Sequence, residues 1–238
     1  MLQAGISVIG VGRRQENLDE FVKTGGSKAA ASRFDITQIQ DIPSWAASIN
    51  KDHPDLDFVL INSGIQRGFN FANPETVDLK LVDAEFTTNY TSYIHLAMAF
   101  LPYLQKRSES SPAAISFTTS GLAILPLMRC GNYCATKAAL HHFILVLRQQ
   151  LKGGPGNVKC IEILPPAVQT ELHDKKHQPD IENGRSMGMP LDEFTHTAWK
   201  GLLDGKEQVA VGLPAPHFEP GGFEAQRQEV FLKMNGMA

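Results

Sequence analysis

The sequence predicts an α/β protein with a doubly wound parallel sheet. Short apolar runs rich in β-branched residues alternate along the chain with longer amphipathic runs, as in a sheet whose strands are joined by covering helices. The length of 238 residues suits one such domain with a sizeable core. The expected strands are residues 6–11, 31–34, 57–62, 114–119, 159–164 and 208–211.

The amphipathic runs between these strands predict the helices. Gly25 ends the first of them, and Pro43 lies in the first turn of the second, where proline is tolerated. Pro102 lies inside the third and can kink or shorten it. The expected helices are residues 15–24, 42–50, 83–106, 132–151 and 191–203.

The composition argues against nucleic acid and membranes as partners. Lys and Arg total 22 against 25 Asp and Glu, a net charge of −3, and no basic run or membrane-length apolar stretch occurs. At the N-terminus the positive charge follows the apolar run, the wrong order for a signal peptide. The three cysteines form no CxxC pair and are expected to be reduced thiols, so we expect a cytoplasmic protein.

Two histidines could suggest a metal site. His173 and His177 are spaced to share a helix face, but the residues between them are Asp-Lys-Lys, and two lysines repel a cation. We expect a solvated segment there and no metal.

A phenol and an amine stand four residues apart, at Tyr133 and Lys137. In a helix they share a face, and a nearby cation lowers a phenol pKa from its usual value of about 10. Ser120 follows a β-rich run, at the end of a strand where open α/β sheets bind ligands. The three groups suit proton exchange with a carbonyl or alcohol oxygen. The alternative is an ordinary pair on a helix surface.

With Asn89, these residues resemble the Asn-Ser-Tyr-Lys tetrad of the short-chain dehydrogenase/reductase family in order and spacing. The resemblance implies a Rossmann-like fold and hydride transfer between a nicotinamide cofactor and a carbonyl or alcohol. It implies that Tyr133 is the general acid in reduction and that Ser120 polarises the substrate oxygen. Lys137 would lower the phenol pKa and hold the nicotinamide ribose, and Asn89 would anchor a water that passes protons to Lys137.

Further residues resemble the family's cofactor contacts. Arg13 and Arg14 follow a strand where NAD users tend to carry an acid, and arginine accommodates a 2′-phosphate, so NADP(H) is favoured over NAD(H). A solvated basic turn is the alternative. Asp35 and Ile36 resemble the pair that flanks the adenine.

Two other runs match family motifs at the cofactor site, each with one departure. Ile61 replaces an asparagine in the first, and Pro166 replaces a glycine in the second, where it restricts the preceding residue. The matching residues are Asn62, Gly64, Pro165, Val168 and Thr170.

The family's Thr-Gly-x-x-x-Gly-x-Gly turn, which binds the cofactor pyrophosphate at a helix N-terminus, does not occur in the sequence. Gly10 and Gly12 begin a GxGxxG pattern, but Gln15 stands at its third glycine. A better match places Gly5 at the end of the family's first helix and residues 6–11 at its second strand. We therefore expect an incomplete domain over residues 1–212 that lacks the first strand and the glycine loop.

Such a chain should be less stable than an intact member and gain little or no thermal stability from NADPH. The alternative function is a catalytically silent fragment or an interaction protein.

In the family the two longest helices pair between subunits, which implies a homodimer or tetramer. Residues 171–189 match a substrate lid, and the tail at 213–238 has no counterpart. A small, partly hydrophobic substrate is suggested by Leu122, Ile124, Leu125, Leu127, Met187 and Met189.

Overall fold

The computed structural model describes residues 1–237 and divides into two compact units, Met1–Ile42 and Pro43–Ala238. Each unit has its own parallel sheet, with strand order β1-β2 in the first and β3-β4-β5-β6 in the second. The boundary after Ile42 lies inside the domain expected over residues 1–212, and the residues of the tail fall in the second unit.

The first unit is a strand–helix–strand arrangement that follows a short helical turn. Leu2–Ala4 form one 3-10 turn, which Gly5 ends in the left-handed region at φ 80°. The regular elements that follow are β1 (Val8–Gly12), α1 (Gln15–Gly25) and β2 (Ala29–Arg33). This order confirms the first two expected strands and the helix between them.

Gly10 lies within β1 and makes room for the packing of α1. A Cβ atom at Gly10 would lie 2.9 Å from the ring of Phe21, so the strand and the helix approach each other closely only because Gly10 has no side chain. A Cβ atom at Gly12 would meet Leu18 at an ordinary 3.9 Å. The glycine of the incomplete GxGxxG pattern therefore has a packing role.

The sheet of the second unit is covered by helices on both faces. Its strands are β3 (Phe58–Ile61), β4 (Ala113–Thr118), β5 (Val158–Leu164) and β6 (Gln208–Ala210). Its helices are α2 (Ile42–Asp52), α3 (Leu79–Phe86), α4 (Ser92–Arg107), α5 (Gly131–Lys152), α6 (Leu191–Leu203) and α7 (Phe223–Met234). All six strands found within residues 1–237 lie within two residues of their expected bounds, and α6 has the expected bounds.

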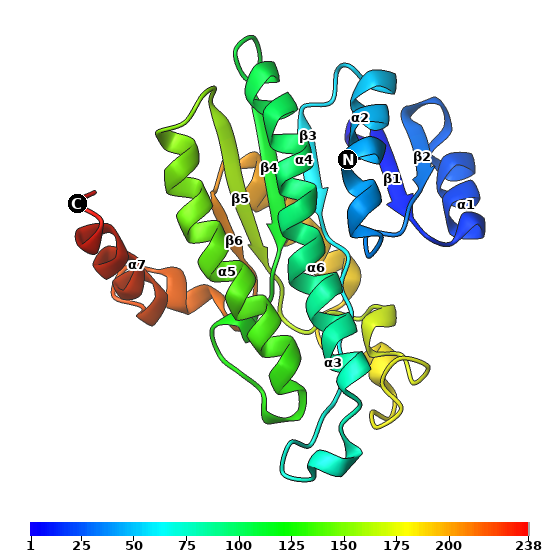
Figure 1. Cartoon of the computed structure of the whole chain (residues 1–238), viewed down its shortest axis with the longest axis vertical. Coiled ribbons are helices and arrows are strands. Elements are labelled where there is room, and N and C mark those ends of the chain that lie inside the picture. The colour runs from blue at the N-terminus through cyan, green and yellow to red at the C-terminus, as the bar shows by residue number, and fades with distance from the viewer. Residues whose placement is uncertain (238) are drawn as a thin grey trace. The chain divides into compact units, whose positions relative to one another are not determined.

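The alternation of side chains along β5 shows how the two faces differ. Ile161 and Ile163 pack against α6 in an apolar cluster, whereas Glu162 between them contacts His141 of α5. Figure 1 shows α4 and α5 in front of this sheet and α6 behind it. On the α4 and α5 side, Phe117 of β4 stacks on Tyr93 of α4 at 6.5 Å between ring centroids.

The helix expected at 83–106 is interrupted, but not at its proline. Pro102 lies inside α4, which continues unbroken to Arg107, and the interruption is a π-helical segment at Thr87–Thr91. Asn89 lies in this segment and bonds to a loop and to α5, contacts that the local sequence does not encode. Such π segments often occur at functional positions.

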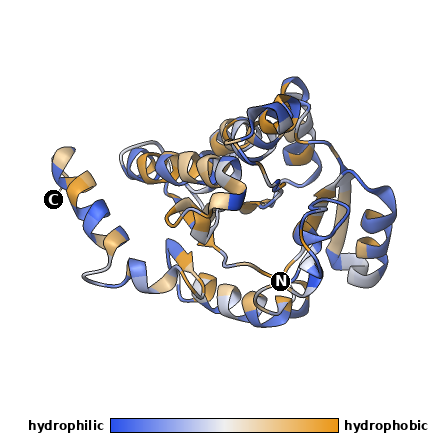
Figure 2. Ribbon diagram, turned by 90° about the horizontal axis from the view of Figure 1, so that it is seen from below, coloured by the Kyte–Doolittle hydropathy of each residue, from blue (hydrophilic) through white to orange (hydrophobic). Residues whose placement is uncertain are grey.

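The tail forms α7, which the sequence analysis did not predict. Hydrophilic and hydrophobic residues are interspersed along this helix next to the C-terminus (Figure 2), without the apolar stripe that usually docks a helix. Within residues 1–237, no helix has the length and apolar character needed to cross a membrane.

Candidate active site

The structure brings Ser120, Tyr133 and Lys137 together in the second unit. Ser120 follows the carboxyl end of β4, and Tyr133 and Lys137 lie in the first two turns of α5. The Ser120 hydroxyl bonds to the phenol of Tyr133, and the Lys137 Nζ lies 5.8 Å from the centre of the Tyr133 ring. All three side chains are buried, with exposed fractions of 7%, 6% and 2% respectively. They are therefore not a solvated pair on a helix surface.

The Lys137 amine is held by the backbone at the end of β4. Its Nζ donates a 2.8 Å hydrogen bond to the carbonyl oxygen of Thr118 and lies 5.1 Å from the ring centre of Tyr93. Burial lowers the pKa of Lys137 to about 7, while the charge of Glu162 acts in the opposite direction. At neutral pH this amine can therefore both give and take a proton.

The pKa of Tyr133 moves in the direction opposite to the expected one. Burial raises it, and the hydrogen bond from Ser120 offsets this only in part. The neighbouring Cys130, Cys134 and Glu85 raise it further. The spacing correctly predicted the proximity of the two groups, but it contained no information on how deeply they are buried.

Asn89 fastens the loop after β3 to α5. Its Oδ1 accepts from the Ile65 N–H at 2.9 Å, and its Nδ2 donates to the Ile65 carbonyl at 2.8 Å and to Thr136 Oγ1 at 3.2 Å. Gly64 lies beside this amide. A Cβ atom there would lie 3.4 Å from Asn89 Oδ1 and 3.8 Å from Lys137 Nζ, so the glycine keeps space next to both groups.

The other predicted loop residues lie at the carboxyl ends of β3 and β5. Asn62 is exposed directly after β3. The Pro165 carbonyl accepts from the Gly121 N–H at 2.8 Å, which joins the loop after β5 to the loop that carries Ser120. Val168 is buried and bridges to Met189, and Thr170 caps a short turn by accepting from the Leu172 N–H.

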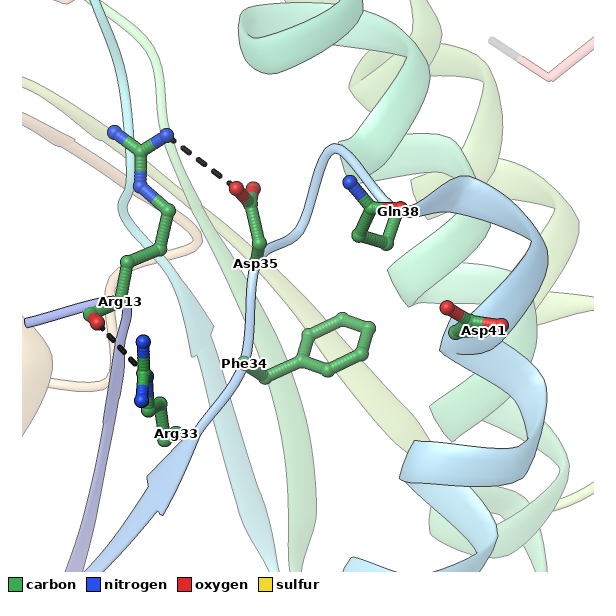
Figure 3. Close-up of a pocket in the computed structure, with 6 residues that line it drawn as sticks. All are labelled: Arg13, Arg33, Phe34, Asp35, Gln38 and Asp41. Atoms are coloured by element: carbon green, nitrogen blue, oxygen red, sulfur yellow. Dashed lines mark hydrogen bonds and ion pairs between the residues drawn. The ribbon is translucent and has the colours of Figure 1, made fainter.

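In the first unit, Arg13 and Asp35 line a pocket of 470 Å³ (Figure 3). Arg13 Nη1 lies 3.4 Å from Asp35 Oδ2, and Thr37 donates to Asp35 Oδ1 through its N–H at 3.0 Å and its hydroxyl at 2.8 Å. Although burial alone would raise it, the pKa of Asp35 is lowered by Thr37 and Arg13. The lining residues are Arg13, Arg33, Phe34, Asp35, Gln38 and Asp41.

Arg33 is the basic residue of this pocket that the sequence analysis missed. In the register of the two strands Gly12 pairs with Arg33, so the ends of β1 and β2 place Arg33 beside Arg13. The Arg33 Nε donates to the Arg13 carbonyl at 3.2 Å. Strand pairing could have indicated it, because parallel strands end at the same edge. Arg14 and Ile36, also predicted as cofactor contacts, do not line this pocket.

The segment 171–189 is tied down by a buried glutamine. Gln178 Nε2 donates to Gln66 Oε1 at 3.1 Å, and its Oε1 accepts from Arg129, which also pairs with Asp180 at 2.6 Å. His173 is buried against Gln178, so the expectation that this histidine is solvated is wrong. Among residues 1–237 no group of three or more metal-binding side chains occurs.

The comparison with known families decides what kind of protein carries this cluster. Residues 1–180 match the family described as short chain dehydrogenase. The chain belongs to this family. A short chain dehydrogenase of this kind is an oxidoreductase, and the Rossmann-like α/β fold expected from the sequence is confirmed.

The names of two relatives differ in how much they say about activity. The chain is 34% identical to the uncharacterised oxidoreductase DltE of Bacillus subtilis over 212 residues, 88% of this chain and 79% of that protein. It is 28% identical to the NADP-dependent 3-hydroxy acid dehydrogenase YdfG of Shigella flexneri over 163 residues, 68% of this chain and 63% of that protein.

Solved structures with the same fold include complexes with either nicotinamide cofactor. A short chain dehydrogenase/reductase from Burkholderia phymatum in complex with NAD superposes with a TM-score of 0.78 at 16% identity, covering 98% of this chain and 88% of that one. The closed form of serine dehydrogenase complexed with NADP+ superposes with a TM-score of 0.73 at 23% identity, covering 88% and 86%. At these identities the likeness concerns the fold.

Proposed function

We propose that the protein is an NADP(H)-dependent oxidoreductase that interconverts a carbonyl and an alcohol by hydride transfer. The observation that carries the proposal is the buried cluster in which the Tyr133 phenol bonds to Ser120 with the Lys137 amine beside the ring. Because burial raises the phenol pKa, Tyr133 is protonated at neutral pH. It is therefore prepared to donate a proton to the oxygen of a carbonyl that is being reduced.

Each residue of the cluster has a separate task in this proposal. The cofactor, when bound, supplies or accepts the hydride. The Ser120 hydroxyl donates a hydrogen bond to the substrate oxygen, and Tyr133 transfers the proton to it. Lys137, whose pKa is about 7, returns a proton to Tyr133 and would hold the nicotinamide ribose. Asn89 anchors the water that supplies Lys137.

Arg13 and Arg33 support the preference for NADP(H). The Arg13 side chain is 67% exposed, and the carboxylate that it contacts, Asp35, is also bonded by Thr37. Arg13 and Arg33 line the same pocket, and a guanidinium group suits a 2′-phosphate, which it can bind through paired hydrogen bonds. YdfG is named as NADP-dependent, which agrees with this choice. Arg14, Asp35 and Ile36 would contact the adenosine half.

The substrate class and the assembly are part of the same proposal. Apolar side chains stay exposed in the loops near Ser120 and Val168, among them Leu127 at 51% and Met187 at 38%, which suits a small, partly hydrophobic substrate. Met98 on α4 and Val146 on α5 are exposed at 49% and 43% and support pairing of these helices in a homodimer or tetramer. Three free, buried thiols suit the cytoplasm.

The test combines binding with turnover. The purified chain is incubated with NADPH or NADH, melting is followed, and cofactor oxidation is measured with a panel of aldehydes, ketones and 3-oxo acids. The proposal expects oxidation of NADPH in preference to NADH, and its loss in Tyr133→Phe. Oxidation that survives this substitution would remove the proposed mechanism.

A catalytically silent protein is the second candidate, and the absence of a Thr-Gly-x-x-x-Gly-x-Gly run from the sequence favours it. Within residues 1–237, β1 and β3 each pair with one strand only, and both leave an apolar side chain exposed, Val11 and Leu60 at 41% each. These features support the proposal that the family's first strand and glycine loop are missing. This candidate predicts little or no stabilisation by micromolar NADPH, and a clear rise in melting temperature would contradict it.

A further inference from the structure

A buried cluster of charges lies one helical turn beyond Lys137, outside the proposed catalytic residues. His141 of α5 contacts Glu162 of β5 through Nδ1, at 2.7 and 2.9 Å, and Glu224 of α7 through Nε2, at 3.0 Å. The exposed fractions of these three side chains are 1%, 0% and 1%. Charges buried to this extent are costly unless they are paired, so the cluster needs an explanation.

Glu162 is fixed in position from two sides. Its Oε1 accepts a 2.7 Å hydrogen bond from the Thr119 hydroxyl, directly after β4, and both oxygens face His141. Lys137 lies four residues before His141 on α5, so the two side chains share a face of the helix. Glu162 is accordingly the acidic group whose charge acts against the desolvation of the Lys137 amine.

The helix α7 closes the cluster from the outside. Arg227 Nη2 and Nε bond to the two oxygens of Glu224 at 2.7 and 2.8 Å, and Gln228 Nε2 bonds to Oε1 at 3.0 Å. Arg227 Nη2 also lies 2.5 Å from His141 Nε2, where two cations repel each other. The carboxylates on either side of the ring offset this repulsion. Although burial alone would lower it, the pKa of His141 is raised to about 9 by Glu162 and Glu224.

We propose that Glu162 is a positioning residue that opposes the loss of positive charge from the Lys137 amine, with Thr119 and His141 fixing the direction of its carboxylate. The Lys137 amine lies beside the rings of Tyr93 and Tyr133, which carry no charge while protonated. It bonds to the carbonyl of Thr118, and the hydroxyl of the next residue, Thr119, bonds to Glu162, which separates the amine from the His141 cation along the cluster. Removing this carboxylate leaves a buried amine with no opposing charge. The inference rests on the proposed function only for its effect on catalysis, since the charge of Lys137 can be measured without cofactor or substrate.

The test follows the Lys137 side chain directly. Lysine labelled with carbon-13 at Cε is incorporated, the Lys137 signal is assigned by its loss in Lys137→Arg, and its shift is titrated by NMR. We expect the pKa of Lys137 to fall by about one unit or more in Glu162→Gln, since an opposite charge at close range shifts a pKa by about one to three units. Glu162→Asp retains the charge at a greater distance from the amine, so the pKa of Lys137 should lie between those of the wild type and Glu162→Gln.

The matched control is Glu207→Gln, which changes a partly exposed glutamate that pairs with Lys152 and should leave Lys137 unchanged. If Glu162→Gln does not fold, the pKa of Lys137 in Glu162→Asp decides whether the inference holds. A Lys137 pKa equal to that of the wild type in the folded Glu162 variants would overturn the inference. A shifted Lys137 in a chain that never oxidises NADPH would leave the inference standing and remove only the proposed function.

Discussion

The Lys137 amine donates a hydrogen bond of 2.8 Å to the carbonyl oxygen of Thr118, the last residue of β4. This bond joins the second turn of α5 to the strand that leads directly into Ser120. The amine and the hydroxyl are thus placed by the same strand end, and Tyr133 lies next to both. The arrangement depends on backbone geometry, so single side chains of the cluster can be changed without dismantling it.

Tyr133→Phe tests the proton transfer while sparing the fold. Removal of the hydroxyl should lower turnover by about 10²- to 10⁴-fold, the usual contribution of a general acid. The free energy of unfolding should change by only about 1 kcal/mol, because one hydrogen bond to Ser120 is lost. Steady-state NADPH oxidation and urea unfolding give the two quantities. Tyr103→Phe is the control, since that phenol bonds to the Pro54 carbonyl on the surface, and it should retain full turnover.

The free energy of unfolding should change little between pH 7 and 9, because two buried groups of α5 titrate in opposite senses. Burial lowers the pKa of Lys137 from 10.5 to about 7, so above pH 7 the unfolded chain binds a proton that the folded chain does not, and stability rises with pH. The pKa of His141 is raised from 6.5 to about 9, so its contribution is complete below pH 6.5 and is lost as the pH rises through 9.

Lys137→Met should uncover the contribution of His141. In this variant the free energy of unfolding should decline between pH 6.5 and 9, by at most about 1.4 kcal/mol per pH unit. Urea unfolding at a series of pH values measures it. Lys152→Met, at the exposed end of the same helix, should keep the flat profile of the wild type. An equally flat profile in Lys137→Met would show that the two groups do not compensate each other.

Glu224 should anchor the tail helix. Although burial alone would raise it, the pKa of Glu224 is lowered to about 2 by hydrogen bonds from His141, Arg227 and Gln228. Its contribution is therefore present above pH 4.5 and is lost as the pH falls towards 2. Glu224→Gln should destabilise the docked helix at neutral pH by about 3 kcal/mol, since it breaks a buried ion pair.

Limited proteolysis and acid unfolding measure this effect. Glu224→Gln should be cut faster in the residues before α7 and should lack the acid-dependent loss of stability below pH 4.5. Glu229→Gln, on an exposed position of the same helix, should behave like the wild type. Equal cleavage rates in the two variants would mean that α7 is held by other contacts.

Arg33→Ala tests the phosphate preference of the pocket in the first unit. The substitution removes one of the two guanidinium groups that line the pocket and should weaken binding of NADPH at least about tenfold, since a charge-assisted hydrogen bond contributes about 1.5–3 kcal/mol. Binding of NADH, which has no 2′-phosphate, should be unchanged. Isothermal titration calorimetry with both cofactors gives the ratio of the two affinities, and Arg185→Ala, in the segment 171–189, is the control. If Arg33→Ala weakened the binding of NADPH and NADH equally, Arg33 would support the fold of the pocket and not recognise the phosphate.

The strands were predictable because their apolar runs are short, β-branched and bounded by turns, and all six are confirmed. The π-helical segment between α3 and α4 was not, since Asn89 within it bonds to Ile65 and Thr136, which are distant in sequence. The docking of α7 was missed for the same reason. Glu224 looks like a surface residue until His141 is brought next to it.

In the candidate site, the spacing of Tyr133 and Lys137 predicted that they lie together, and the structure brings Ser120 to them. The direction of the phenol pKa could not be predicted, since burial is a property of the whole sheet. Glu162 was missed because it lies in a largely apolar strand with no motif around it. Proximity along one helix can be inferred from spacing, whereas desolvation and partners from other elements cannot.

Gly10→Ala and Gly12→Ala separate the two interpretations of the glycines in β1. At Gly10 an added methyl group would lie 2.9 Å from the Phe21 ring, and such overpacking costs about 1–3 kcal/mol. At Gly12 the nearest atom is 3.9 Å away, so alanine fits and should leave the free energy of unfolding nearly unchanged. Urea unfolding and NADPH titration of both variants provide the measurement. If the two glycines were a phosphate-binding fingerprint, both substitutions would weaken NADPH binding equally. If Gly10 serves packing, only Gly10→Ala will lower stability, and Gly12→Ala will bind as the wild type does.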